Sequence, residues 1–275
     1  MKHGAPGRSI LRGTEFYAVL KEIIAMHAAV DFADIAADVL GRIRDRAPRV
    51  HCITNSVAQQ YTANMLLAAG AVPSMTIAPE EIGAFVAGAD TLLVNLGTFD
   101  GERKSAIEAA LAAVGGRPWL LDPVFIERSP SRAAFARRLI GARPAVVRLN
   151  RAEFAALDPT GGPPELIAQA HATVVALTGD VDLVVDGARR VTVANGHPLM
   201  ALVTAMGCAG SALICAALAV EADAVMASVA ALTALGVAGE VAAESARGPG
   251  SFAAAIIDVL HALDRATLRT RLKVS

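Results

Sequence analysis

A run of small residues in the last third of the chain, Ala205-Met-Gly-Cys-Ala-Gly-Ser211, combines a cysteine with two glycines and opens an alanine-rich helical segment. A tight turn at the start of a helix gathers free backbone N–H groups at the positive end of the helix dipole, where an anion such as a phosphate binds well. Cys208 in that place would have a lowered pKa and could act as a base or a nucleophile. The alternative is structural: the glycines allow close helix packing, and Cys208 is a small buried hydrophobic residue.

Polar residues also follow several short apolar runs that have the length of buried strands. They are Thr54-Asn55, Asn95 to Thr98, Asp122-Pro123, Asn150 with Glu153, and Thr178 to Asp182. In a parallel α/β sheet, ligands bind beyond the carboxyl ends of the strands. If these runs are strands of one such sheet, the polar residues converge on one edge, which indicates an enzyme site.

Short apolar runs alternate with longer helical patterns along most of the chain. The predicted strands are Arg49–Thr54, Val72–Thr76, Thr91–Asn95, Trp119–Asp122, Ala145–Leu149, Thr173–Leu177, Leu183–Asp186 and Val191–Ala194. The predicted helices cover 57–69, 80–87, 102–114, 132–141, 151–157 and 164–171, then most of the chain from 208 on, with a break at 248–250 and a last helix over 251–268. This βαβ alternation predicts an α/β fold with a mostly parallel central sheet and helices on both faces, and a hairpin around Gly187 at the sheet edge.

Composition narrows the class of protein. The chain has 275 residues and a net charge of −1, so a nucleic-acid partner is not expected. No uninterrupted apolar run approaches the roughly 20 residues of a membrane span, and we expect no membrane association. Three cysteines without metal-ligand spacing fit a reducing cytoplasm. We expect residues 1–30 to be an N-terminal extension, either a frayed start or a docking segment, and residues 31–275 to form a single domain.

A series of short motifs in a fixed order carries a family resemblance. The pieces are His51-Cys-Ile-Thr-Asn55, Tyr61-Thr-Ala-Asn64, Gly70 to Met75 with Glu80-Glu81, Asn95-Leu-Gly-Thr98, Asp122-Pro-Val124, Asn150-Arg-Ala-Glu153, Thr178 to Asp182, Asn195-Gly-His197, Gly207-Cys208 and Gly248-Pro-Gly-Ser-Phe252. Together they resemble the hydroxyethylthiazole kinases, a branch of the ribokinase-like superfamily, over roughly residues 48 to 260. The resemblance implies a ribokinase-like three-layer sandwich. The chain has no Gly-x4-Gly-Lys-Ser/Thr loop, so P-loop chemistry is excluded.

The resemblance also implies an activity. A hydroxyethylthiazole kinase moves the γ-phosphoryl group of ATP, with Mg²⁺, to the hydroxyl of 4-methyl-5-(2-hydroxyethyl)thiazole in thiamine salvage, and the family is usually a homotrimer with sites between subunits. Two alternatives stay open at this point. The acceptor could be another small alcohol such as a hydroxymethylpyrimidine, or the chain could be a weakly active or non-catalytic member that binds a ligand.

Matching the family's motifs residue by residue implies a role for each candidate. Those roles are Cys208 as the base, Gly207 on the transferred phosphate and the substrate, Asp122 and Glu153 on magnesium, Arg132, Thr178 and Asp180 on ATP, and Met75 and Asn55 on the thiazole. Several of these residues also have a purely structural interpretation. Arg132 could be a solvated residue in the first turn of a helix, Glu153 a carboxylate that favours a helix dipole, and Met75 a core residue. His51 is expected to be a strand histidine with its hydrogen bonds satisfied.

Two segments depart from the family's pattern. Ala205 and Met206 replace glycine and alanine in the phosphate turn; a Cβ at 205 restricts the backbone if that residue needs a positive φ, and Met206 is expected to add bulk beside the phosphate path. Residues 125–128 replace a glycine-rich loop after Asp-Pro-Val. Glu127 then brings a carboxylate near the polyphosphate, which is unfavourable unless magnesium or Arg128 offsets it.

Overall fold

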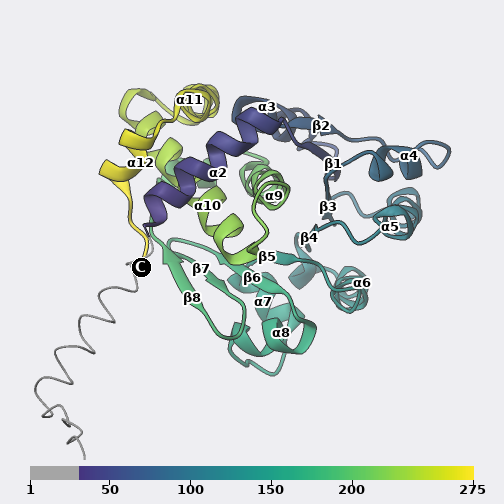
Figure 1. The fold of residues 1–275 in the computed structure, drawn as a ribbon. Helices are drawn as coiled ribbons and strands as arrows, with labels where there is room; N and C mark the ends of the chain where they lie inside the picture. The colour runs from purple at the N-terminus through teal and green to yellow at the C-terminus, as the bar shows by residue number, and fades with distance from the viewer. Residues whose placement is uncertain (1–30) are drawn as a thin grey trace, which may run out of the picture. The chain divides into compact units, whose positions relative to one another are not determined.

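Eight strands form one sheet in the order β2-β1-β3-β4-β5-β6-β7-β8 in the computed structural model of the protein, which describes residues 31–275 (Figure 1). The extension expected at residues 1–30 lies outside the described part of the chain. The strands are β1 Arg49–Ile53, β2 Val72–Ser74, β3 Thr91–Asn95, β4 Trp119–Asp122, β5 Val146–Asn150, β6 Val174–Thr178, β7 Asp182–Val185 and β8 Arg190–Val193. All eight predicted strands are confirmed, with bounds within two residues of those expected.

The first six strands are parallel, so their carboxyl ends lie at the same edge of the sheet. β7 and β8 are antiparallel and form the expected hairpin, which turns at Gly187 with φ +92°. The C-terminal residues cover the free edge of β8, where Thr192 N donates to Ser275 O at 2.7 Å and Ala194 N donates to Lys273 O at 2.8 Å. The sheet edge is thereby protected from pairing with other strands.

Helices cover both faces of the sheet, as the alternation of elements predicts (Figure 1). Successive strand residues point to opposite faces, so Leu93 and Leu120 join one core and Leu92 and Leu121 join the other. The first face carries α2 Phe32–Arg46, α3 Gln59–Ala69, α9 Met206–Leu218, α10 Ala224–Ser245, α11 Pro249–Ala262 and α12 Arg265–Arg271. The second carries α4 Ile82–Ala87, α5 Gly101–Ala113, α6 Pro130–Ile140, α7 Arg151–Leu157 and α8 Pro164–His171, and the short 3-10 helices are Ile126–Arg128 and Pro198–Leu202.

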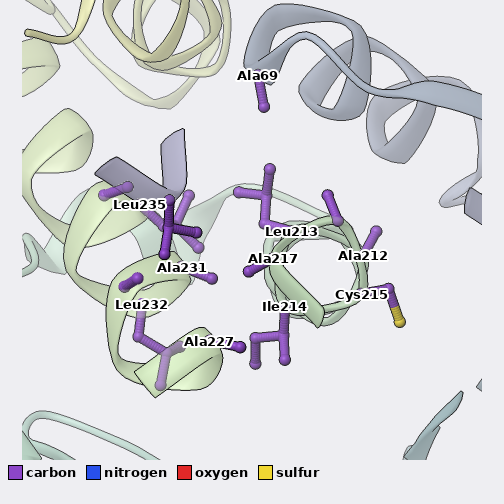
Figure 2. Packing of buried hydrophobic residues seen from close by; sticks show 14 of the residues in the cluster. Ala69, Ala212, Leu213, Ile214, Cys215, Ala217, Ala227, Ala231, Leu232 and Leu235 are labelled. Carbon is purple, nitrogen blue, oxygen red and sulfur yellow. The ribbon is translucent and has the colours of Figure 1, made fainter. Parts of the chain in front are cut away.

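The helix pair α9 and α10 forms the centre of the first face. Figure 2 shows Leu213 and Ala217 of α9 turned toward Ala231 and Leu235 of α10, whereas Cys215 points away from α10. α10 is apolar and long enough to cross a membrane, yet 78% of its most apolar window is buried within the fold. Burial on the sheet therefore accounts for its apolar character.

Two features of the helices differ from the expectation. The predicted last helix over 251–268 is wrong in one respect: it breaks after Ala262, and α12 starts anew because the side chain of Asp264 accepts a hydrogen bond from Thr267 N at 2.8 Å. The helix α2 was not predicted. Its buried residues Ala36, Val39, Leu40 and Ile43 have the spacing of an amphipathic helix.

Candidate active site

Asn95, Asp122 and Cys208 come together where β3 and β4 end and α9 begins. Asn95 Nδ2 donates to Asp122 Oδ2 at 2.8 Å and to Cys208 Sγ at 3.3 Å. Ser211 Oγ, one turn along α9, donates to the same Asp122 oxygen at 2.8 Å. Asp122 Oδ1 is buried and has no hydrogen-bond partner. The candidate base and a candidate metal ligand are thus connected through a single amide, and one carboxylate oxygen is left for a ligand.

Burial controls the charge state of both titratable groups. It raises the pKa of the Cys208 thiol to about 12, and the nearby Asp122 carboxylate raises it further. The expected lowering of this pKa is therefore wrong, because desolvation outweighs the lowering effects of Asn95, Arg148 and Thr54. Burial also raises the pKa of Asp122 to about 6, against the lowering effect of Arg148. In the ligand-free protein the thiol form of Cys208 predominates at neutral pH.

The turn before α9 has the backbone geometry of an anion site. Ala205 is the N-cap of α9 and has φ +73°, so the position does need a positive φ, as the departure from glycine suggested. A Cβ built on Gly207 would lie 2.8 Å from Arg148 Nη1, which places the guanidinium directly against this turn. The exposed N–H groups of a helix start and a guanidinium both favour a phosphate.

Met206 lies elsewhere than expected. Its side chain is 7% exposed and belongs to the core cluster under α9 and α10. The expectation that it adds bulk beside the phosphate path is therefore wrong, because the first turn of α9 directs this residue into the core.

Glu153 has a structural role that the structure makes explicit. Its Oε2 accepts from Asn150 N at 2.8 Å while Asn150 Oδ1 accepts from Glu153 N at 2.9 Å, which is a capping box at the start of α7. Its Oε1 accepts from Phe125 N at 2.9 Å. Both oxygens are thus engaged, and Glu153 fixes the loop that follows β4. In that loop Glu127 is paired with Arg128 at 3.3 Å, so Arg128 meets one of the two conditions stated above for a carboxylate at this place.

The candidate nucleotide residues lie on both sides of this loop. Thr178 ends β6 next to Asn150, its register partner on β5. Asp180 is exposed, whereas Asp182 turns back and accepts from Gly179 N at 2.9 Å. Arg132 donates to Val124 O at 2.6 Å and thereby fixes the loop after β4. ATP contacts by Arg132, Thr178 and Asp180 stay predictions.

The candidate thiazole residues follow β1 and β2. Asn55 Oδ1 accepts from Thr98 Oγ1 at 3.1 Å, and Met75 is half-buried against the core. The ring of His51, 0% exposed, contacts Ser74 Oγ at 2.8 Å and Thr76 O at 3.0 Å. The expectation of a satisfied strand histidine is confirmed, and His51 fixes the segment that carries Met75.

Three residues of the site had no role in the sequence interpretation. Asn95 and Ser211 lie within motifs that were noticed, but their contacts with Asp122 depend on the fold. Arg148 occupies a strand position two residues before Asn150, and nothing local marks it as a phosphate residue.

The donor set matches a cation that is held partly by other ligands. No group of three or more His, Cys, Asp or Glu residues among residues 31–275 could hold a metal ion alone. Mg²⁺ commonly uses one or two carboxylates together with substrate phosphates. Asp122, with an unpartnered buried oxygen, fits that arrangement. Each oxygen of Glu153 already accepts one backbone N–H, and its role toward magnesium stays a prediction.

The arrangement of the sheet and its helices defines the fold first. The structure of a ribokinase-like superfamily protein from Enterococcus faecalis superposes on this chain with a TM-score of 0.60 and 13% sequence identity. The superposition covers 81% of this chain and 89% of the other. The fold is therefore the ribokinase-like α/β sandwich, as predicted.

The particular family follows from closer relatives. The model of the hydroxyethylthiazole kinase family matches residues 40–161 and 164–266. A probable hydroxyethylthiazole kinase of Agrobacterium fabrum is 46% identical over 227 residues, covering 82% of this chain and 88% of that protein. The hydroxyethylthiazole kinase structure from Pyrococcus horikoshii has a TM-score of 0.84 and 36% identity, covering 88% and 98% of the two chains. The chain belongs to the hydroxyethylthiazole kinase family.

Proposed function

We propose that this protein transfers the γ-phosphoryl group of ATP to the hydroxyl of 4-methyl-5-(2-hydroxyethyl)thiazole, as in thiamine salvage. The observation that supports this most is the connection of Cys208 Sγ to Asp122 through Asn95, directly beside the Gly207 turn and Arg148. An acceptor hydroxyl and a terminal phosphate would meet there. Family membership supports the choice of acceptor.

The phosphate end of the reaction depends on Gly207 and Arg148. Phosphoryl transfer is catalysed mainly by positioning and by neutralising charge. The first N–H groups of α9 and the Arg148 guanidinium would hold the oxygens of the γ-phosphate. Because Gly207 has no side chain, the Arg148 guanidinium can lie directly against these N–H groups.

The acceptor end depends on Cys208. The hydroxyl oxygen forms the new bond to phosphorus as the bond to the β-phosphate oxygen breaks. The hydroxyl proton passes to Cys208 Sγ in its thiolate form. Because the pKa of this thiol is about 12 in the ligand-free protein, the reactive fraction increases with pH.

Magnesium would be held by Asp122 through Oδ1, with Glu153 acting on the site through the loop at Phe125. When bound, Mg²⁺ would offset the charge of the ATP phosphates. Arg132, Thr178 and Asp180 remain our candidates for further ATP contacts, and Asn55 and Met75 for contacts with the thiazole.

A coupled assay for ADP release tests the proposal. It compares the thiazole alcohol, a hydroxymethylpyrimidine and no acceptor, with Cys208→Ala as the control protein. ADP release that requires the thiazole alcohol supports the proposal. Release with the pyrimidine alone would assign another acceptor, and saturable ligand binding without turnover would show a non-catalytic member.

We also propose a homotrimer in the cytoplasm. The edge strand β2 and the neighbouring helix α4 expose apolar side chains, Val72 at 46% and Phe85 at 43%, around a hollow of about 430 Å³. Such a patch on an edge strand fits a second copy of the chain. The three cysteines are all free, which agrees with a reducing compartment. Light scattering after gel filtration of the wild type and of Phe85→Glu checks the oligomer: the variant should give a lower mass.

A further inference from the structure

The orientation of the Asn95 side-chain amide is fixed by the backbone. Gly97 N–H can only donate, so the Asn95 atom that it contacts at 3.0 Å is the carbonyl oxygen Oδ1. Nδ2 therefore points the other way, with one N–H toward Asp122 Oδ2 and one toward Cys208 Sγ. Asn95 is 1% exposed; its bonds to Asp122 and Gly97 are buried, and its bond to Cys208 is partly buried. Every hydrogen-bonding atom of this amide is committed within the site.

We propose that Asn95 is a positioning residue that holds the Cys208 sulfur at a fixed place relative to the Asp122 carboxylate. This inference rests on the proposed function, in which Cys208 receives the hydroxyl proton. In that reaction Asp122 would hold the cation that meets the phosphates, the Gly207 turn would bind the terminal phosphate, and Cys208 would contact the acceptor hydroxyl. Asn95 is the side chain that touches both groups, so it sets the distance between the two halves of the reaction.

Ser211 provides a matched comparison. Ser211 Oγ and Asn95 Nδ2 donate to the same oxygen, Asp122 Oδ2, each at 2.8 Å, and both side chains are buried. Within the described residues 31–275, the Ser211 side chain makes its hydrogen bond to Asp122 alone. Removing either residue takes one donor from Asp122, but only removal of Asn95 also takes a donor from Cys208, which leaves Thr54 as another side chain that acts on this thiol.

The experiment measures acceptor-dependent kcat for Asn95→Ala and Ser211→Ala, each made with Cys208 present and with Cys208→Ala. With Cys208 present, we expect Asn95→Ala to lower kcat by about three- to tenfold more than Ser211→Ala, the range of one hydrogen bond, with little change in the KM for ATP. With Cys208→Ala, the two substitutions should cost the same. An equal extra cost of Asn95→Ala in both backgrounds would show a purely structural role and overturn the proposal.

Urea unfolding of the same proteins gives a readout that needs no activity. A contact between Asn95 and Cys208 predicts non-additive shifts of the unfolding midpoint for that pair and additive shifts for Ser211 with Cys208. Additive shifts for both pairs would overturn the contact and the proposal with it. A folded wild type without acceptor-dependent turnover would instead contradict the proposed function. The urea unfolding of the single and double variants would still test the contact between Asn95 and Cys208. If Asn95→Ala does not fold, Asn95→Ser replaces it, because its hydroxyl can accept the Gly97 N–H.

Discussion

The guanidinium of Arg148 stands directly against the backbone of Gly207, so close that a β-carbon on this glycine would lie 2.8 Å from Nη1. The relationship joins the middle of the sheet to the first turn of α9. A side chain on residue 207 would make the end of the Arg148 side chain shift away from the turn. The Nε atom of Arg148 is buried without a hydrogen-bond partner. A cation held in this way is available to a phosphate.

We predict that Arg148, rather than Arg132, dominates nucleotide binding. Arg148→Ala should raise the Kd for ATP by about tenfold or more, because a charge-assisted hydrogen bond contributes roughly 1.5–3 kcal/mol. Arg132→Ala is the matched comparison and should act mainly on stability, since its guanidinium donates to Val124 O at 2.6 Å. Calorimetric titration with a non-hydrolysable ATP analogue measures both. A larger loss of affinity in Arg132→Ala would restore the original assignment of that residue.

Cys208 should tolerate aspartate better than alanine. Cys208→Asp keeps an oxygen base at the same place, whereas Cys208→Ala removes the proton acceptor, so we expect Cys208→Asp to have at least tenfold higher kcat, within the usual range for general base catalysis. Steady-state rates with the thiazole alcohol at pH 7.5 measure this. Equal rates for the two variants would count against a base role.

The pH dependence of kcat is a second test of Cys208 as the base. Burial raises the pKa of the wild-type thiol to about 12, so the thiolate fraction grows about tenfold for each pH unit below that value. We predict a rising kcat between pH 7 and 9 for the wild type and a flat profile for Cys208→Asp. A flat wild-type profile over this range would show that the thiolate is not the proton acceptor in the rate-limiting step.

The sequence predicted the sheet because its strands are continuous apolar runs whose length and order need no tertiary information. It also placed Asp122 at the site, through the rule about carboxyl strand ends, whereas Cys208 was singled out by its place in a small-residue turn that opens a helix and by the family resemblance. The pKa of Cys208 was predicted with the wrong sign, because it depends on how deeply α9 sits on the sheet. The predicted position of the Met206 side chain was wrong for the same reason. The role of Arg148 could be inferred only from its contact with Gly207.

Ionisation of Asp122 should make the ligand-free protein less stable as the pH rises. Burial raises its pKa from 3.8 to about 6, so between these values the folded state binds more protons than the unfolded state. The stability contributed by the protonated form is present below about pH 4 and is lost as the pH rises through about 6, by an amount on the order of 2–3 kcal/mol. Asp122→Asn removes this titration. The free energy of unfolding of Asp122→Asn, relative to that of the wild type, should therefore increase between pH 4 and 7.

Urea unfolding without Mg²⁺ or ATP at several pH values measures that difference. Asp180→Asn is the control, because its carboxylate is exposed at the same edge of the sheet and should leave the pH dependence of stability nearly unchanged. A constant difference between the wild type and Asp122→Asn across this pH range would contradict the burial argument.

Replacement of Ala205 by glycine should stabilise the protein. An alanine at φ +73° costs about 1–2 kcal/mol relative to a right-handed backbone, and glycine avoids this cost while losing some entropy on folding. We expect Ala205→Gly to raise the free energy of unfolding by about 0.5–1 kcal/mol. Ala209→Gly, inside α9 and fully buried, is the control and should lower stability by about 1 kcal/mol or more. Since the turn already has the conformation that glycine would adopt, kcat should change less than twofold. A loss of stability in Ala205→Gly would contradict the prediction and would mean that packing of the alanine methyl group outweighs its backbone strain.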